Sequence, residues 1–156
     1  MKKWALLIGV VLVIGLFIRV KPTGVDVAAL KPVEVLYVDS KNGSYYLFTD
    51  TGQQGSGKTV QLAIEDLKAR SSGKVFLNTA EHLLISPVAW EAVGRFSQYL
   101  RPDCGVVIAV GQPNMKNVPD FLQTHKPDVT LNDLRAGERG IPVLYSGEGG
   151  MCLEQP

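Results

Sequence analysis

The pattern of apolar and polar positions predicts a β-hairpin at the start of the folded region. Two β-branched and aromatic runs occupy residues 33–39 and 44–50. Between them lies Ser40-Lys41-Asn42-Gly43, and Asn-Gly is the strongest short hairpin signal. The two runs are therefore expected to form antiparallel strands joined by a tight turn.

A helix is predicted next, after a glycine-rich stretch over residues 52–57 that is expected to form a loop. Apolar residues then recur at i, i+3, i+4 and i+7 from Lys58 to Arg70, which is the spacing of one helix face. The helix is expected to end at Ser71-Ser72-Gly73. The residues of the apolar face are Val60, Ala63, Ile64 and Leu67.

The later apolar runs are short and predict buried strands. Residues 75–77 and 83–85 are two such runs, and the second is expected to be a strand. Residues 106–110, Val-Val-Ile-Ala-Val, are apolar throughout. A strand of this composition is expected to be buried on both faces of a sheet.

Helix signals separate these runs and follow them. Ser86-Pro87 is typical of an N-cap followed by proline at the first helical position, and it predicts a helix to about Leu100. A short helix is predicted after Pro119. A second is predicted after Thr130, because Thr130 and Asp133 have the spacing of a capping pattern.

The element order β-β-α-β-α-β-α predicts an α/β (α+β) fold with a small mixed sheet of about four strands, preceded by one transmembrane helix. No internal repeat is present. The predicted organisation is a membrane anchor over residues 1–20, a linker over 21–32, the α/β domain over 33–135 and a Gly-rich tail over 136–156.

The first apolar segment predicts a membrane anchor. Residues 4–18 contain no charge, and Lys3 and Arg19 flank them, so these two side chains can reach the lipid headgroups. A cleaved signal peptide is the alternative, but the residues after the run, Arg19-Val20-Lys21-Pro22, do not resemble a cleavage site. The lysines near the start place the N-terminus in the cytoplasm. The domain is then expected outside, with residues 4–18 in contact with lipid.

Charge excludes one class of partner. The first 21 residues hold four of the 16 Lys and Arg residues and none of the 15 Asp and Glu residues. The remainder is therefore slightly acidic, whereas a nucleic-acid binder needs an excess of cations. No nucleic-acid partner is expected.

One motif suggests a different function. The stretch from Gly52 to Thr59 fits the phosphate-binding pattern G-x-x-x-x-G-K-[ST], in which Gly52 and Gly57 shape the loop, Lys58 neutralises phosphates and Thr59 binds Mg²⁺. No later apolar run ends in the aspartate that such a site needs for its metal. The preceding strand also belongs to a hairpin. The alternative is a glycine-rich loop before a helix.

No other catalytic or metal-binding constellation is found, so no catalytic residue, cofactor or metal is expected. His82 and His125 are far apart and lack metal-ligand spacing. Cys104 and Cys152 are the only cysteines. They form either one disulfide or two free thiols, and the sequence does not decide between these states.

The residues from Gly57 to Leu77 and from Glu81 to Ser86 resemble the N-terminal domain of the C subunit of bacterial spore germinant receptors (GerAC-like). The shared features are a G-x-[ST] helix start, an A-[IL]-x-x-L helix, a [RK]-[LV]-[FY] run and an apolar strand ending in Ser or Gly. The similarity covers roughly residues 33–135. In contrast to that family, no cysteine follows the first apolar run, and neither a lipid anchor nor the family's later domains are expected for this chain. The resemblance implies membrane tethering and a non-catalytic scaffolding role.

The expected function is that of a non-enzymatic, single-pass membrane protein. Its extracytoplasmic domain would be a scaffold or partner-binding subunit in a sporulation or germination-type membrane complex. Two alternatives stay open. One is a phosphate-loop nucleotide-binding protein that uses residues 52–59. The other is a ring-forming domain, a homo-oligomer, in a secretion-like assembly.

Overall fold

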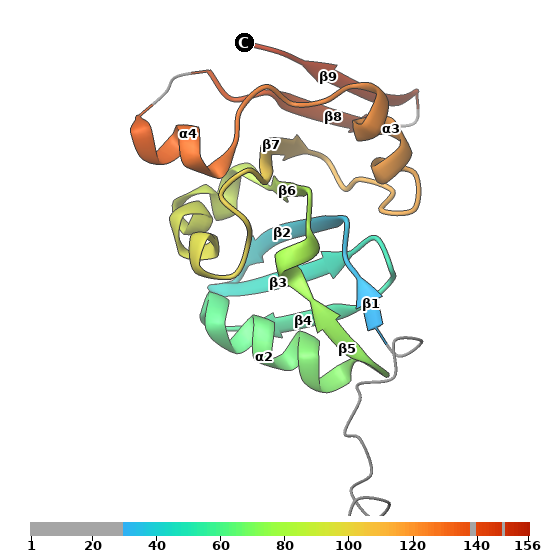
Figure 1. Cartoon of the computed structure of the whole chain (residues 1–156), viewed down its shortest axis with the longest axis vertical. Helices are drawn as coiled ribbons and strands as arrows, with labels where there is room; N and C mark the ends of the chain where they lie inside the picture. Colours follow the sequence, from blue (N-terminus) through green and yellow to red (C-terminus); the bar gives the residue numbers. More distant parts are fainter. Residues whose placement is uncertain (1–29, 138–139, 148) are drawn as a thin grey trace, which may run out of the picture.

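Seven strands form one mixed sheet in the computed structural model, which describes residues 30–137, 140–147 and 149–156. The strands with the same direction, β2, β6, β7 and β8, are neighbours in the sheet. In spatial order the seven are β4 (Gln54–Gly57), β3 (Ser44–Thr49), β2 (Val35–Lys41), β6 (His82–Ile85), β7 (Gly105–Val110), β8 (Val143–Gly147) and β9 (Gly150–Glu154) (Figure 1).

Antiparallel hairpins extend the parallel strands on both sides. β3 and β4 lie beyond β2, and β9 lies beyond β8. The predicted turn between β2 and β3 is confirmed, since Asn42 and Gly43 have φ angles of 53° and 71°. A separate parallel pair joins β1 (Leu30–Pro32) to β5 (Lys74–Phe76).

Helices cover the two faces of the sheet unequally. The face called the α2 face packs against α2 (Val60–Arg70), the 3-10 helix η3 (Pro87–Gln98) and α4 (Leu131–Ala136). A further 3-10 turn, η2 (Leu77–Thr79), follows β5. The opposite face, called the α3 face, packs against the seven-residue helix α3 (Val118–Thr124). One short helix leaves part of the α3 face open.

The helices predicted for the α/β domain are present, with differences at their ends and in type. The four apolar residues predicted for the face of α2 are all buried. α2 begins at Val60 rather than Lys58, because the side chain of Thr59 caps it and accepts a hydrogen bond from the amide of Leu62 (3.2 Å). Thr130 and Asp133 form the predicted capping box. The helix predicted over residues 87–100 is a 3-10 helix.

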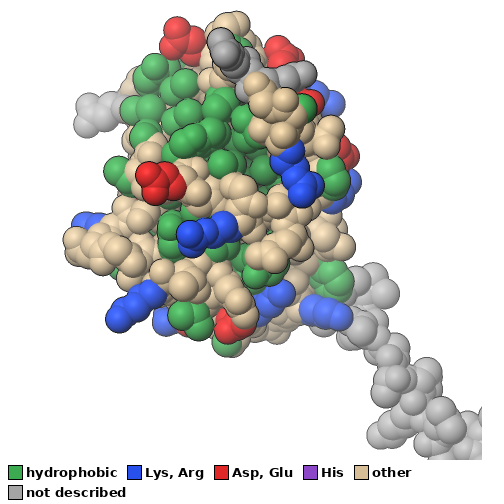
Figure 2. All heavy atoms as spheres, turned by 90° about the vertical axis from the view of Figure 1, so that its left-hand side faces the viewer, with side chains coloured by type: hydrophobic (Ala, Val, Ile, Leu, Met, Phe, Trp, Pro, Cys, Tyr) green, Lys and Arg blue, Asp and Glu red, His purple; other side chains and the backbone are tan. Residues whose placement is uncertain are grey.

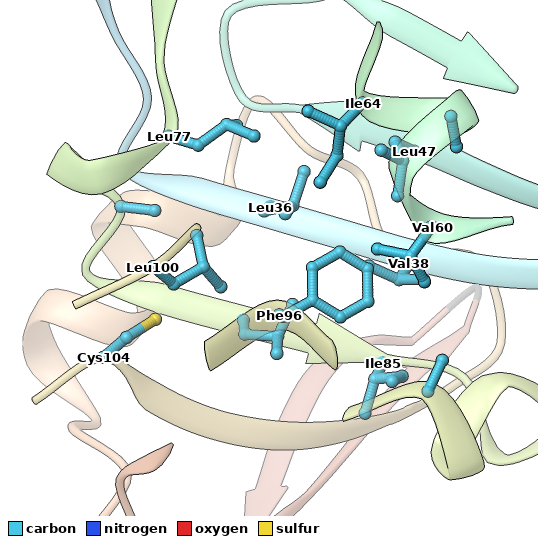
Figure 3. Packing of buried hydrophobic residues seen from close by; sticks show 14 of the residues in the cluster. Leu36, Val38, Leu47, Val60, Ile64, Leu77, Ile85, Phe96, Leu100 and Cys104 are labelled. Carbon is cyan, nitrogen blue, oxygen red and sulfur yellow. The ribbon is translucent and has the colours of Figure 1, made fainter. Parts of the chain in front are cut away.

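Alternation along the strands builds two cores. In β2, Leu36 and Val38 point to the α2 face, whereas Val35 and Tyr37 point to the α3 face. Phe96 of η3 fills the larger core on the α2 face, next to side chains from β2 and α2 (Figure 3). The central strand β2 is thus buried on both sides, as its uninterrupted apolar run requires.

The prediction of about four strands was too low. β4 lies in the stretch expected to be a loop, β8 and β9 lie in the stretch expected to be a tail, and β1 ends the expected linker. Glycine and polar residues in β4 and β9 hide the period-two pattern of a strand.

The expected membrane helix over residues 4–18 lies outside the described residues. Within the part of the chain that the structure describes, no helix has the length and apolar character needed to cross a bilayer.

Candidate functional site

A cleft of about 410 Å³ opens at the carboxyl ends of the parallel strands β2, β6 and β7. This is the edge at which open α/β sheets bind ligands. The cleft lies on the α3 face, where side chains of alternate residues point to the same side of the sheet. Its lining residues are Tyr37, Asp39, Lys41, Tyr46, Phe48, Ser86, Pro87, Ala109, Gly111 and Gln112.

Strand register explains the hollow. Asp39 is paired with Tyr46 on β3, and Ser86 directly follows the register pair of Val38 with Ile85 on β6. From β3 to β7 the side chains at this level of the sheet change in size. β3 carries the ring of Tyr46, β2 carries the carboxylate of Asp39, and Ser86 and Ala109 on the β6 and β7 side are small. Small residues beside large rings leave a concave surface of the kind that holds small molecules.

The hydroxyl of Ser86 is the unusual group at this site. The backbone of Ser86 is satisfied: its amide donates to Val38 O (2.8 Å) and its carbonyl accepts from the amide of Ala89 (3.0 Å). Ser86 precedes η3 as predicted, but its side chain makes no capping hydrogen bond. Its Oγ is buried and has no partner among the described residues. An unsatisfied buried polar group costs about 1–3 kcal/mol, which a polar ligand would offset.

Aromatic rings form one wall of the cleft. Tyr37 and Phe48 are stacked, with ring centroids 5.9 Å apart. Burial raises the pKa of Tyr37 to about 12, and the negative charge of Asp39 adds to this effect. The Tyr37 phenol is protonated at neutral pH, as an ordinary tyrosine is, and can donate a hydrogen bond.

Two opposite charges at the cleft stay apart. Asp39 Oδ1 accepts a hydrogen bond from the amide of Ser40 (2.8 Å). Lys41 is exposed at the rim. Among the described residues, neither side chain takes part in an ion pair. The carboxylate of Asp39 is thus available to a cation from outside the protein.

The residues of the phosphate-binding motif do not form a cradle. Gln54 to Gly57 form the edge strand β4, antiparallel to β3, instead of a loop. Gly57 packs against α2, and Thr59 caps that helix. Lys58 is exposed. The phosphate-loop interpretation needs a loop whose amides converge on one anion, and an extended strand turns its amides alternately to opposite sides.

The glycines of this motif have a packing function. A Cβ atom on Gly55 would lie 2.4 Å from Ala63 O and 2.5 Å from Leu67 N, which are both backbone atoms of α2. Gly57 meets α2 in the same way. The backbone of β4 therefore touches the backbone of α2, and only glycine permits this approach.

The histidines are separated. His82 is buried on β6, and burial lowers the pKa of its imidazole below the usual value. His125 stacks on Phe121, with ring centroids 4.5 Å apart. In the described ranges, no group of three or more His, Cys, Asp or Glu side chains could hold a metal ion.

The two cysteines are free thiols in different surroundings, so the expected disulfide alternative is not formed. Cys104 is fully buried, and burial raises the pKa of its thiol to about 12. Cys152 is exposed on the edge strand β9.

A thiol reagent is expected to distinguish the two cysteines. At pH 8, 5,5′-dithiobis(2-nitrobenzoic acid) should react with one thiol per native chain, because the reagent needs an accessible thiolate. Denaturation should release the second of the two thiols. In Cys152→Ser, the native chain should not react. Rapid reaction of both thiols in the native wild-type chain would contradict the burial of Cys104.

A second surface carries exposed apolar side chains. Val110 and Tyr145 are register partners on β7 and β8, and they are 38% and 45% exposed. Ile108 and Val143 form the neighbouring pair and are partly exposed. Hydrophobic side chains gather in the upper part of the side shown in Figure 2. We call these four residues, together with the free edge of β9, the β7–β9 surface.

No family model, curated protein or solved structure matches this chain.

Proposed function

We propose that this chain is a non-enzymatic, membrane-tethered subunit whose extracytoplasmic domain binds a partner subunit through the β7–β9 surface. The observation that carries the proposal is the pair of exposed apolar side chains, Val110 and Tyr145, beside an open sheet edge. Contiguous exposed apolar area next to a strand with one free edge marks a protein interaction site.

The two edges of the sheet differ. At β4 the amide of Ser56 donates to the carboxylate of Asp66 on α2 (2.8 Å), so the helix caps this edge. At β9 no described residue outside β8 bonds to the backbone of Met151 or Leu153. Edges left open in this way are templates for the addition of another strand.

The register identifies the free groups of β9. Pro142 O accepts a hydrogen bond from the amide of Ile108, so even-numbered residues at β8 point their backbone groups toward β7. Odd-numbered residues of β8 then face β9 and pair with Gly150, Cys152 and Glu154. The backbone groups of Met151 and Leu153 therefore point outward. We assign an extended apolar segment of a partner subunit to this edge.

The position of the tether favours a protein partner over the lipid surface. Leu30, where the described chain begins, lies at the opposite end of the domain from β9 (Figure 1). A domain tethered from that end presents β9 away from its anchor. The resemblance to the GerAC-like domain supports a germination-type membrane complex as the assembly.

Leu153→Pro is expected to weaken association with the partner at least tenfold, whereas Leu153→Ala, which loses the same packing against the α3-face core but keeps the amide donor, should weaken it much less. Proline removes an outward-pointing donor, which β8 does not use, and proline is tolerated at such edge positions. The full-length chain would carry a photo-crosslinking amino acid at Tyr145 and be irradiated in membranes of its source cells. Mass spectrometry would then map the crosslinked peptide.

Two controls make this test specific. A crosslinker at Leu62, half-exposed on α2 and remote from β9, should give no product with the same partner. Cys152→Pro removes a donor that pairs with β8, so it should destabilise the domain itself. A crosslink to a second copy of the chain would indicate the ring-forming alternative and contradict the proposal. Equal products from residues 62 and 145 would do the same.

A further inference from the structure

We propose that the cleft at the carboxyl ends of β2, β6 and β7 binds a small organic ammonium ion. The cleft combines one unpaired carboxylate, Asp39, with the rings of Tyr37, Tyr46 and Phe48. Aromatic faces attract cations through their quadrupole, and quaternary ammonium ions are recognised by such rings. A nearby carboxylate supplies the opposite charge. This site is separate from the β7–β9 surface and does not depend on it.

The geometry of the strands brings the carboxylate to the rings. Asp39 and Tyr46 are register partners on β2 and β3, so their side chains are direct neighbours on the α3 face. Tyr37 and Phe48 form the next pair on the same face. Tyr46 is 36% exposed, so one ring of the set is open to an incoming molecule.

One buried polar group of the cleft, the hydroxyl of Ser86, is available to a ligand. Ser86 is 5% exposed, lines the cleft, and has a hydroxyl with no partner among the described residues. The side chain of Gln112 also lines the cleft and is exposed. A hydroxyl accepts as well as donates, so Ser86 can meet an N–H or an O–H of the ligand. The ligand class is therefore an ammonium ion that also carries a hydroxyl or similar polar group.

Removal of the charge of Lys41 tests whether the ligand is a cation. The side chain of Lys41 leaves the same face of β2 as that of Asp39, two residues along the strand, where the backbone positions are about 7 Å apart. This like charge weakens the binding of a cation, so its removal should tighten that binding. The same charge would strengthen the binding of an anion or of the carboxylate of a zwitterion. The direction of the change thus separates these ligand classes.

Choline is a suitable probe, with 3,3-dimethylbutan-1-ol as its neutral isostere. Isothermal titration of the full chain in uncharged detergent is expected to show that choline binds at least tenfold more tightly than the alcohol. Asp39→Asn should weaken choline binding about tenfold. Asparagine keeps the oxygen that accepts the hydrogen bond from Ser40, so the strand end is preserved. Ser86→Ala should weaken it severalfold.

Lys41→Gln is expected to tighten choline binding about threefold, the effect of one like charge at this distance in a water-exposed site. Equal affinity for choline and the neutral alcohol would overturn the proposal, as would unchanged binding in Asp39→Asn. Tighter binding of glycine betaine than choline, together with weaker betaine binding in Lys41→Gln, would replace it with a zwitterion site. The urea midpoint of unfolding of each variant would be compared with that of the wild type. Where the midpoints agree, a change in affinity comes from the cleft and not from loss of the fold.

Lipid headgroups are a second source of the same chemistry. The chain would be reconstituted in vesicles of phosphatidylglycerol or of phosphatidylethanolamine, and choline binding compared between them. Loss of choline binding only in phosphatidylethanolamine indicates that the headgroup ammonium occupies the cleft. Equal binding in both indicates a free ligand. Absence of binding in detergent and in both vesicles would overturn the proposal.

Discussion

Replacement of Gly55 by alanine is expected to destabilise the domain by about 3 kcal/mol, at the upper end of the usual cost of overpacking. The added Cβ would meet Ala63 O and Leu67 N at 2.4 and 2.5 Å. Both are backbone atoms of α2, which no side-chain rotation can move away. β4 must therefore separate from α2. Urea unfolding of the full chain in detergent, followed by circular dichroism, would measure the loss.

Gly94→Ala is the matched control. Gly94 lies in η3, and nothing lies within 4 Å of the Cβ it would receive. Its effect should stay within about 1 kcal/mol of zero, because alanine is also the better helix former. Similar losses in both variants would mean that glycine replacement destabilises the chain for a reason other than contact with α2.

A variant of Lys58 tests the phosphate-binding motif. Lys58→Ala should leave the free energy of unfolding unchanged, since Lys58 is exposed and makes no ion pair with any described residue. If the motif held nucleotide, Lys58→Ala would abolish ATP binding by the full chain. If the motif serves only packing, neither the wild-type chain nor Lys58→Ala is expected to bind ATP. In that interpretation, Gly55 and Gly57 are required by the fold, and the match to the motif is a coincidence of composition.

Local signals allowed the first hairpin and α2 to be predicted. Asn42-Gly43 specifies the turn, and the turn sets the pairing of Asp39 with Tyr46. β4 was missed for a physical reason. Its residues facing α2 are Gly55 and Gly57, so the strand has no apolar side chain on its buried side. A pattern of hydrophobic positions cannot reveal a strand that packs through its backbone.

The second hairpin was missed because it is half open to solvent. β9 alternates intermediate and exposed residues and begins at Gly150, so its composition is that of a polar tail. Its partner β8 has one fully buried side chain, Leu144. Strands at a sheet edge gain less from burial and carry weaker hydrophobic patterns than central strands such as β7.

The cleft depends on contacts that sequence spacing does not reveal. Ser86 is the N-cap residue of η3, as the Ser-Pro pair predicted, but its side chain makes no capping hydrogen bond. Its hydroxyl lies among residues of the cleft that come from β2, β3 and β7, which the local signal could not show. The pairing of Asp39 with Tyr46 follows from the hairpin turn and could be predicted from the sequence. The approach of β6 and β7 depends on the order of the parallel strands, which no local signal specifies.

Phe96→Ala is expected to destabilise the domain by about 3–5 kcal/mol, the range for truncation of a buried aromatic residue. Phe96 is fully buried and fills the space between β2 and α2, where Val38 and Val60 lie beside its ring (Figure 3). It also anchors the end of η3, because its carbonyl accepts from the amides of Tyr99 (2.9 Å) and Leu100 (3.0 Å).

Phe96→Leu shows whether the volume of the side chain or the shape of the aromatic ring stabilises the core. Leucine keeps most of the apolar contact, so the expected loss falls to about 1 kcal/mol. Both variants would be compared by urea unfolding of the full chain in detergent. Equal losses in the two would indicate that ring shape, not filled volume, stabilises this core. A loss below about 1 kcal/mol in Phe96→Ala would contradict the position of η3 against the sheet. Because η3 begins directly after Ser86, that result would also remove the structural basis of the cleft.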